Sequence, residues 1–329
     1  MGSLRRILIA IKDYEAKTTP ALVKGAQLAR AVGARIELFH GISAPLYVDG
    51  YGSFNVELPQ VERTMRTRIL AKLEKMAQRL RHDGIEVTVA AEWDFPVYEA
   101  IVRRANRIQA DLIIADQHAG KHRVAGLLHL TDWELLRLSP VPVLLVKTPG
   151  TYQHPVVLAA IDPGHTFSKP AKLDQRILTA SSTVASALRG TQHVLHAYAP
   201  FPFTADPETM INQETVERLQ ADATAAAQKA LDRELRTSRI PKSQRHIVGR
   251  HPADAIAQMA KETHSAIVVM GAISRSGLKR LFIGNTAERV LDLLTCDVLI
   301  VKPAHFANRV PRGRRGARVV AAVSTALPP

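Results

Sequence analysis

The chain has 329 residues, 46% of them hydrophobic and 22% charged, and this length suits about two domains of roughly 150 residues each. No run of about 18 uncharged apolar residues is present, and the one cysteine, Cys296, cannot form an intramolecular disulfide, so we expect a protein of the reducing cytoplasm without a membrane partner. The net charge of +14 comes without a basic patch interleaved with aromatic residues, so we expect no specific nucleic-acid partner.

The first half alternates short apolar runs with amphipathic helical patterns. The apolar runs predict strands at residues 7–11, 36–40, 86–91, 112–115 and 141–146. The helical patterns predict helices at residues 20–32, 61–82, 96–107 and 132–138.

The second half repeats this order after a short, turn-rich segment at residues 148–152. Strands are predicted at residues 156–161, 193–198, 245–248, 266–270 and 298–301, and helices at residues 173–188, 207–237, 252–262 and 287–294. Strands that alternate with helices imply a parallel sheet covered by helices on both faces. The predicted fold class is α/β, with two tandem, doubly wound, five-stranded parallel-sheet domains at residues 1–150 and 151–303.

The C-terminal segment is basic and lacks the apolar period of the rest. It carries five arginines and no acidic residue from Pro303 on: Arg309, Arg312, Arg314, Arg315 and Arg318. Because such a segment can bury little apolar surface, we predict that residues 304–329 form a basic, disordered tail. An anion-binding arm is the alternative.

An internal repeat links the two halves. Residues 110–147 align with residues 265–302 at a constant offset of 155 and without a gap. The alignment places Asp116 on Gly271, Thr131 on Thr286 and Lys147 on Lys302. The halves are therefore two copies of one domain whose loops after the fourth strand differ.

Candidate binding residues of the second half follow its predicted strands. Asp162 follows the first strand, Gly271 to Gly277 follow the fourth, and Gly284, Asn285 and Thr286 precede the last helix. Ligands of open α/β sheets bind at the carboxyl ends of the strands, and a helix N-terminus favours phosphate. Arg275, Lys279 and Arg280 add positive charge. The alternative is a capping box made by Asn285 and Glu288, which needs no ligand.

The loop of the second half resembles that of the universal stress protein family. Nucleotide-binding members carry a G-x2-G-x9-G-[ST] signature, and Gly271, Ser274, Gly284 and Asn285 keep its spacing with two substitutions. Asp162 matches the family's aspartate after the first strand. The strings GNTAE and TDW resemble the tandem, E-type members. The resemblance implies two adenine nucleotide alpha hydrolase-like domains, ATP or another adenine nucleotide in the second, and pairing of the domains within the chain, so that one chain mimics a dimer. Further association of two chains as a homodimer is left open.

The first half departs from this pattern. Lys12 stands in place of the aspartate, Asp116 in place of the first loop glycine, and His129 and Leu130 in place of Gly284 and Asn285. Asp116 and Asp132 would repel a phosphate, so we predict a universal stress domain with a degenerate ligand loop. His118, His122 and His129 could bind zinc, but the predicted loop favours solvated histidines, and we assign no metal ligands.

These patterns favour a binding or regulatory protein of the stress response over an enzyme. Neither a G-x-S-x-G motif nor a P-loop is present, and we assign no catalytic residue. His40 and His196 are interpreted as satisfied histidines at strand ends. The alternatives are a weak nucleotide hydrolase and a carrier that holds an apolar ligand between the two domains.

Overall fold

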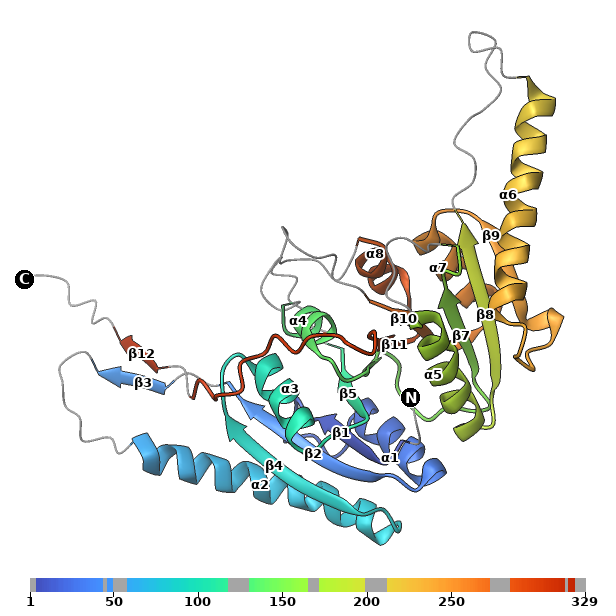
Figure 1. Cartoon of the computed structure of the whole chain (residues 1–329). Coiled ribbons are helices and arrows are strands. Elements are labelled where there is room, and N and C mark those ends of the chain that lie inside the picture. Colours follow the sequence, from blue (N-terminus) through green and yellow to red (C-terminus); the bar gives the residue numbers. More distant parts are fainter. Residues whose placement is uncertain are drawn as a thin grey trace, which may run out of the picture. The chain divides into compact units, whose positions relative to one another are not determined.

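The computed structural model describes residues 4–43, 46–49, 58–117, 130–164, 172–198, 212–272, 285–316 and 319–322. The chain divides into two compact domains (Figure 1). The first domain comprises Leu4–Gly150 together with Ala307–Pro329, and the second comprises Thr151–Phe306 with the first three residues.

The first domain contains a five-stranded parallel sheet in the order β4-β2-β1-β5-β6. Its strands are β1 (Arg6–Ala10), β2 (Arg35–Ile42), β4 (Val87–Trp93), β5 (Leu112–Asp116) and β6 (Val143–Val146). Its helices are α1 (Pro20–Val32), α2 (Leu58–His82), α3 (Val97–Arg107) and α4 (Leu130–Leu138). Right-handed crossovers require α3 and α4 to lie on the opposite face from α1 and α2, as Figure 1 shows.

The central strand β1 is buried on both faces. Ile7, Leu8 and Ile9 are fully inaccessible to solvent, as expected for a strand covered by helices on each side. Gly25 of α1 lies against this strand, since a Cβ atom there would come within 2.4 Å of Ile9 Cδ1. The helix therefore approaches the sheet more closely than any larger residue would allow.

The second domain repeats this topology in the order β11-β10-β7-β8-β9. Its strands are β7 (Val156–Ile161), β8 (Thr191–Tyr198), β9 (Arg245–Gly249), β10 (Ser265–Gly271) and β11 (Asp297–Val301). Its helices are α5 (Leu173–Ala187), α6 (Gln213–Glu234), α7 (Pro252–Glu262) and α8 (Asn285–Leu293), with a 3-10 turn η1 (Lys242–Gln244). The predicted α/β class with two doubly wound parallel sheets is confirmed.

The strand register shows which residues of the two domains correspond. Ile7 of β1 pairs with Leu112, and Val157 of β7 pairs with Ile267. Leu112 and Ile267 are repeat partners at the offset of 155, so Ile7 corresponds to Val157. Five residues later, Lys12 takes the place of Asp162, as the sequence comparison proposes.

In its described residues, 304–316 and 319–322, the C-terminal segment differs from the predicted disordered tail. Residues 307–316 belong to the first domain, and β12 (Val319–Ala322) pairs in parallel with β3 (Leu46–Asp49). Hydrogen bonds and ion pairs join residues 311–316 to β4, α3 and the turn between them. The partners lie about two hundred positions earlier, so local apolar periodicity does not reveal them.

Across the described ranges, none of the helices combines the length and the apolar character that a membrane crossing requires.

Candidate functional site

Two predicted site residues of the second domain meet at the topological switch point of its sheet. The chain leaves β7 for β8 on one side and later returns to β10 on the other, so the strand order reverses between β7 and β10. Asp162 directly follows β7, and Gly271 ends β10. Because Met270 pairs with Ala160, Gly271 and Asp162 reach the same edge of the sheet. This edge is where open α/β sheets bind ligands.

The first turn of α5 fixes the backbone at Asp162. The Asp162 N–H group donates a hydrogen bond to Asp174 Oδ1 at 3.2 Å. Asp174 is buried and lies in the first turn of α5, where the positive end of the helix dipole stabilises a carboxylate. Asp174 was not among the predicted site residues; its position at a helix start, next to a strand-end aspartate, is the signal that could have identified it.

Gly271 serves helix packing at this edge. A Cβ atom at this position would lie 2.7 Å from Leu173 Cδ2 and 3.2 Å from Ile177 Cδ1, both in α5. The missing side chain therefore allows α5 to pack closely against β10. This requirement holds with or without a ligand, so the glycine alone does not demonstrate a phosphate site.

A buried histidine in the neighbouring strand β8 lies close to the same edge of the sheet. His196 lies near the carboxyl end of β8, and its Nε2 atom is 4.0 Å from the position of a Cβ atom on Gly164. Gly164 lies two residues beyond Asp162. An imidazole therefore borders the same edge of the sheet as the strand-end aspartate.

Several predicted residues lie outside the described residues. These include Ser274, Arg275, Gly277, Lys279, Arg280 and Gly284 of the second-domain loop, and His118, His122 and His129 of the first-domain loop. Asn285 and Thr286 form the first turn of α8. The phosphate end of the predicted nucleotide site therefore remains a prediction.

The corresponding edge of the first domain contains a different arrangement. Asp116 ends β5, and its Oδ1 atom accepts a hydrogen bond of 2.7 Å from the N–H group of Ala21 in the first turn of α1. Thr19 caps the same helix through the N–H group of Leu22. A carboxylate thus occupies a helix N-terminus that could otherwise face an anion. That the first domain does not bind a nucleotide stays a prediction.

His40 of the first domain is a half-buried, hydrogen-bonded histidine near the end of β2. Its Nδ1 atom is 2.7 Å from the carbonyl oxygen of Ile11, and burial lowers the pKa of its imidazole. In the parts of the chain that the structure describes, no group of three or more histidine, cysteine, aspartate or glutamate side chains is placed to hold a metal ion.

Comparisons with known proteins match both halves of the chain. The model of the universal stress protein family matches residues 3–147 and residues 157–302. Universal stress protein E of Photorhabdus laumondii is 28% identical over 93% of this chain and 97% of its own length, and that of Escherichia coli K12 is 26% identical over 94% and 98%. The crystal structure of PA1789 from Pseudomonas aeruginosa PAO1, described as functionally unknown, is 26% identical, covers 92% of this chain and 93% of its own, and has a TM-score of 0.70.

Proposed function

Because the chain belongs to the universal stress protein family in both of its halves, we propose that it is a tandem stress-response protein whose second domain binds one adenine nucleotide, such as ATP. Members of the family bind adenine nucleotides. The relatives named universal stress protein E match over nearly their whole length, in agreement with a two-domain protein of the same type.

The contrast between the two switch points carries this proposal. In the second domain the switch point has an aspartate after the first strand and a glycine at the end of the fourth. In the first domain the same two positions hold Lys12 and Asp116, and the Asp116 carboxylate caps α1. A nucleotide phosphate at this edge of the sheet would be repelled by that carboxylate. The second domain is therefore the better nucleotide site.

In the proposed site each residue type has a distinct task. Asp162 accepts hydrogen bonds from the ribose hydroxyls or the adenine amine, and its backbone is held in place by Asp174. The phosphates lie on the loop that starts at Gly271, where Ser274, Arg275, Gly284, Asn285 and Thr286 supply backbone N–H groups, hydrogen bonds and positive charge.

We assign the protein a binding role with no catalytic residue. The proposal includes pairing of the two domains within the chain, which the resemblance to tandem members implies, and leaves room for a homodimer. The single cysteine favours the cytoplasm as the setting.

A pair of matched substitutions tests the assignment. Asp162→Asn removes the carboxylate of the proposed site, and Lys12→Asn changes the corresponding position of the first domain. We expect the Asp162 variant to bind ATP at least tenfold more weakly, about 1.4 kcal/mol, and the Lys12 variant to bind as the parent does, both measured by titration calorimetry. Circular dichroism should show that both variants are folded. Unchanged affinity in a folded Asp162→Asn variant would remove Asp162 from the site.

A further inference from the structure

A segment near the C-terminus lies on the acidic edge of the first domain. We call residues 311–316 the strap. The strap follows the last strand of the second domain, yet it belongs to the first domain, as does β12 further along the chain. The chain thus returns to its first domain after completing the second.

Backbone hydrogen bonds fix the course of the strap. The N–H group of Arg315 donates to Asp94 Oδ1 at 2.9 Å, and the N–H group of Phe95 donates to the carbonyl oxygen of Gly316 at 3.1 Å. The carbonyl oxygen of Pro311 accepts a bond of 3.0 Å from Arg103 Nη1. These bonds hold the strap along the turn between β4 and α3.

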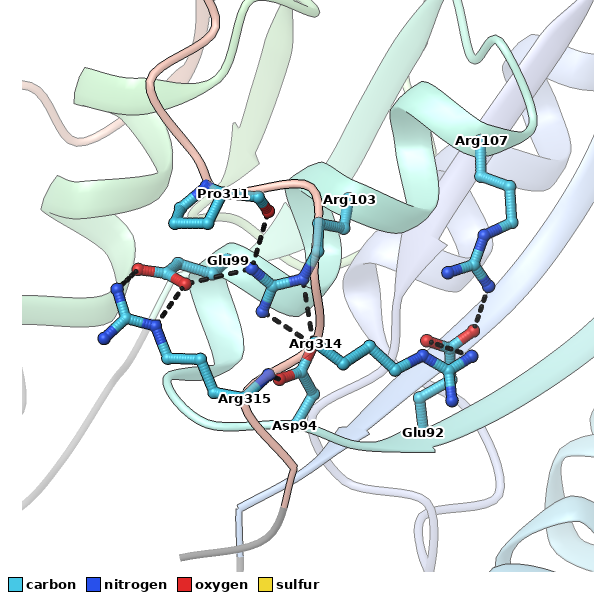
Figure 2. Close-up of polar contacts among 8 residues, drawn as sticks. All are labelled: Glu92, Asp94, Glu99, Arg103, Arg107, Pro311, Arg314 and Arg315. Carbon is cyan, nitrogen blue, oxygen red and sulfur yellow. Dashed lines mark hydrogen bonds and ion pairs between the residues drawn. The ribbon is translucent and has the colours of Figure 1, made fainter.

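Two arginine side chains of the strap extend in opposite directions towards carboxylates, as Figure 2 shows. Arg315 makes a bidentate pair with Glu99, at 2.9 Å from Nε to Oε2 and 2.8 Å from Nη2 to Oε1. Arg314 Nη2 lies 3.0 Å from Glu92 Oε2. The forked pair of Arg315 with Glu99 is specific for arginine, because lysine offers a single point charge.

The three carboxylates are buried, and the described sheet and helices of the first domain bond only one oxygen of each. Glu92 and Glu99 are each 4% exposed and Asp94 is fully buried. Within the first-domain sheet and helices, Arg103 bonds Asp94 Oδ2 and Glu99 Oε2, and Arg107 bonds Glu92 Oε1. Among the described residues, the second oxygen of each acid is bonded only by the strap.

A buried carboxylate oxygen without a partner is costly, so this surface has a strong preference for a cationic hydrogen-bond donor. The surface lies at the carboxyl end of the edge strand β4, away from the switch point between β1 and β5. Asp94 follows β4, and its N–H group donates to the carbonyl oxygen of Ile42 at the end of β2, so the acids mark the carboxyl edge of the sheet. We define Glu92, Asp94 and Glu99 as the acidic dock.

We propose that the acidic dock is a binding site for an arginine-bearing peptide and that its resident occupant is the strap of the same chain. The first domain thereby has an internal peptide ligand at the carboxyl end of its edge strand β4. The two half-exposed arginine side chains make the attachment sensitive to salt, so release of the strap uncovers the dock.

Two other arginines of the same segment provide a matched control. Arg309 and Arg312 are exposed, and in the described part of the chain no hydrogen bond or ion pair joins their side chains to another residue. The double variants Arg314→Ala/Arg315→Ala and Arg309→Ala/Arg312→Ala remove the same charge from the same segment. A general effect of net charge would weaken attachment of the strap equally in the two double variants. If the acidic dock binds the strap, only Arg314→Ala/Arg315→Ala should weaken it.

Hydrogen–deuterium exchange of the full-length protein tests the attachment, with the amide of Phe95 as the reporter. We expect exchange there to be at least tenfold faster in Arg314→Ala/Arg315→Ala than in the parent, and unchanged in the control. In the parent, raising sodium chloride from about 50 mM to about 1 M should accelerate exchange of the Phe95 amide. Salt at these concentrations shortens the electrostatic screening length from above 10 Å to about 3 Å. Equal exchange in all three proteins would overturn the proposal.

A labelled peptide with the sequence of residues 309–316 tests the dock itself by fluorescence anisotropy. We expect the peptide to bind Arg314→Ala/Arg315→Ala at least tenfold more tightly than the parent or the control, because only there is the dock open. Equal binding to all three proteins, or none to the double variant, would contradict a peptide site. A parent dimer in native mass spectrometry that the double variant lacks would assign the strap to a second chain and overturn the intramolecular occupant.

Discussion

The position at the end of the fourth large strand shows how one residue changes the use of a shared fold. Asp116 and Gly271 are repeat partners, and both face the start of the helix that follows the first strand. In the first domain the carboxylate caps α1, whereas in the second the glycine gives room to Leu173 of α5. At the same position, a side chain therefore caps a helix in the first domain, and the lack of a side chain allows a helix to pack closely in the second.

A histidine pair in the second domain makes its stability depend on pH. His193 Nδ1 lies 2.9 Å from His246 Nε2 across β8 and β9, and burial lowers the pKa of both imidazoles, with the charge of His193 adding to the effect at His246. The unfolded chain binds protons near the ordinary histidine pKa of 6.5, while the folded domain resists them. Stability is thus full above the unfolded pKa and falls as the pH drops from there towards the folded pKa.

We therefore expect the free energy of unfolding to decrease from about pH 7 to about pH 5, because the unfolded chain binds more protons than the folded domain. In His246→Gln the decrease should be smaller, because one of the two histidines no longer titrates. Urea titrations at several pH values measure it. His82→Gln, at an exposed position, is the control and should keep the parent's slope. A slope that His246→Gln leaves unchanged would show that the pair does not titrate differently in the folded and unfolded states.

At the scale of elements, the contact between α5 and β10 positions the proposed site. Gly271→Ala places a methyl group within 2.7 Å of Leu173 Cδ2, so we expect a loss of about 1–3 kcal/mol from overpacking. Gly164→Ala is the matched control, because the nearest heavy atom to its Cβ would be His196 Nε2 at 4.0 Å, an ordinary contact. Thermal unfolding compares the two variants. Equal melting temperatures would show that α5 shifts without cost.

The sequence predicts the ten strands of the two large sheets because parallel strands covered on both faces are nearly continuous apolar runs, as in Ile7 to Ile9. It does not predict β3 and β12, which are four residues each and pair across more than two hundred and fifty positions. The strap is hidden for a related reason. Its partners Glu92 and Glu99 lie far back in the chain, and charge pairs leave no local period.

The candidate site shows the same division. The repeat and the position after a strand are enough to select Asp162 and Gly271, and the register places both at the switch point. The buried Asp174 and the histidine pair were missed, because their significance depends on which backbone group or ring faces them in the folded chain.

At the scale of the whole molecule, the two copies have kept one topology and diverged at their ligand edges. The first domain carries a carboxylate at its switch point and an acidic dock occupied by the strap. The second keeps Asp162 and a glycine at the corresponding positions. The residues at each edge therefore suit different partners. The acidic dock of the first domain is bonded by a cationic segment of the chain, and we propose an adenine nucleotide for the second domain.

Titration calorimetry of the full-length protein with ATP measures this asymmetry directly, because the two domains share a fold and differ in their edges. We predict a stoichiometry near one nucleotide per chain, with the site in the second domain and none in the first. Two equivalent sites per chain, or no binding at all by the folded parent, would contradict it.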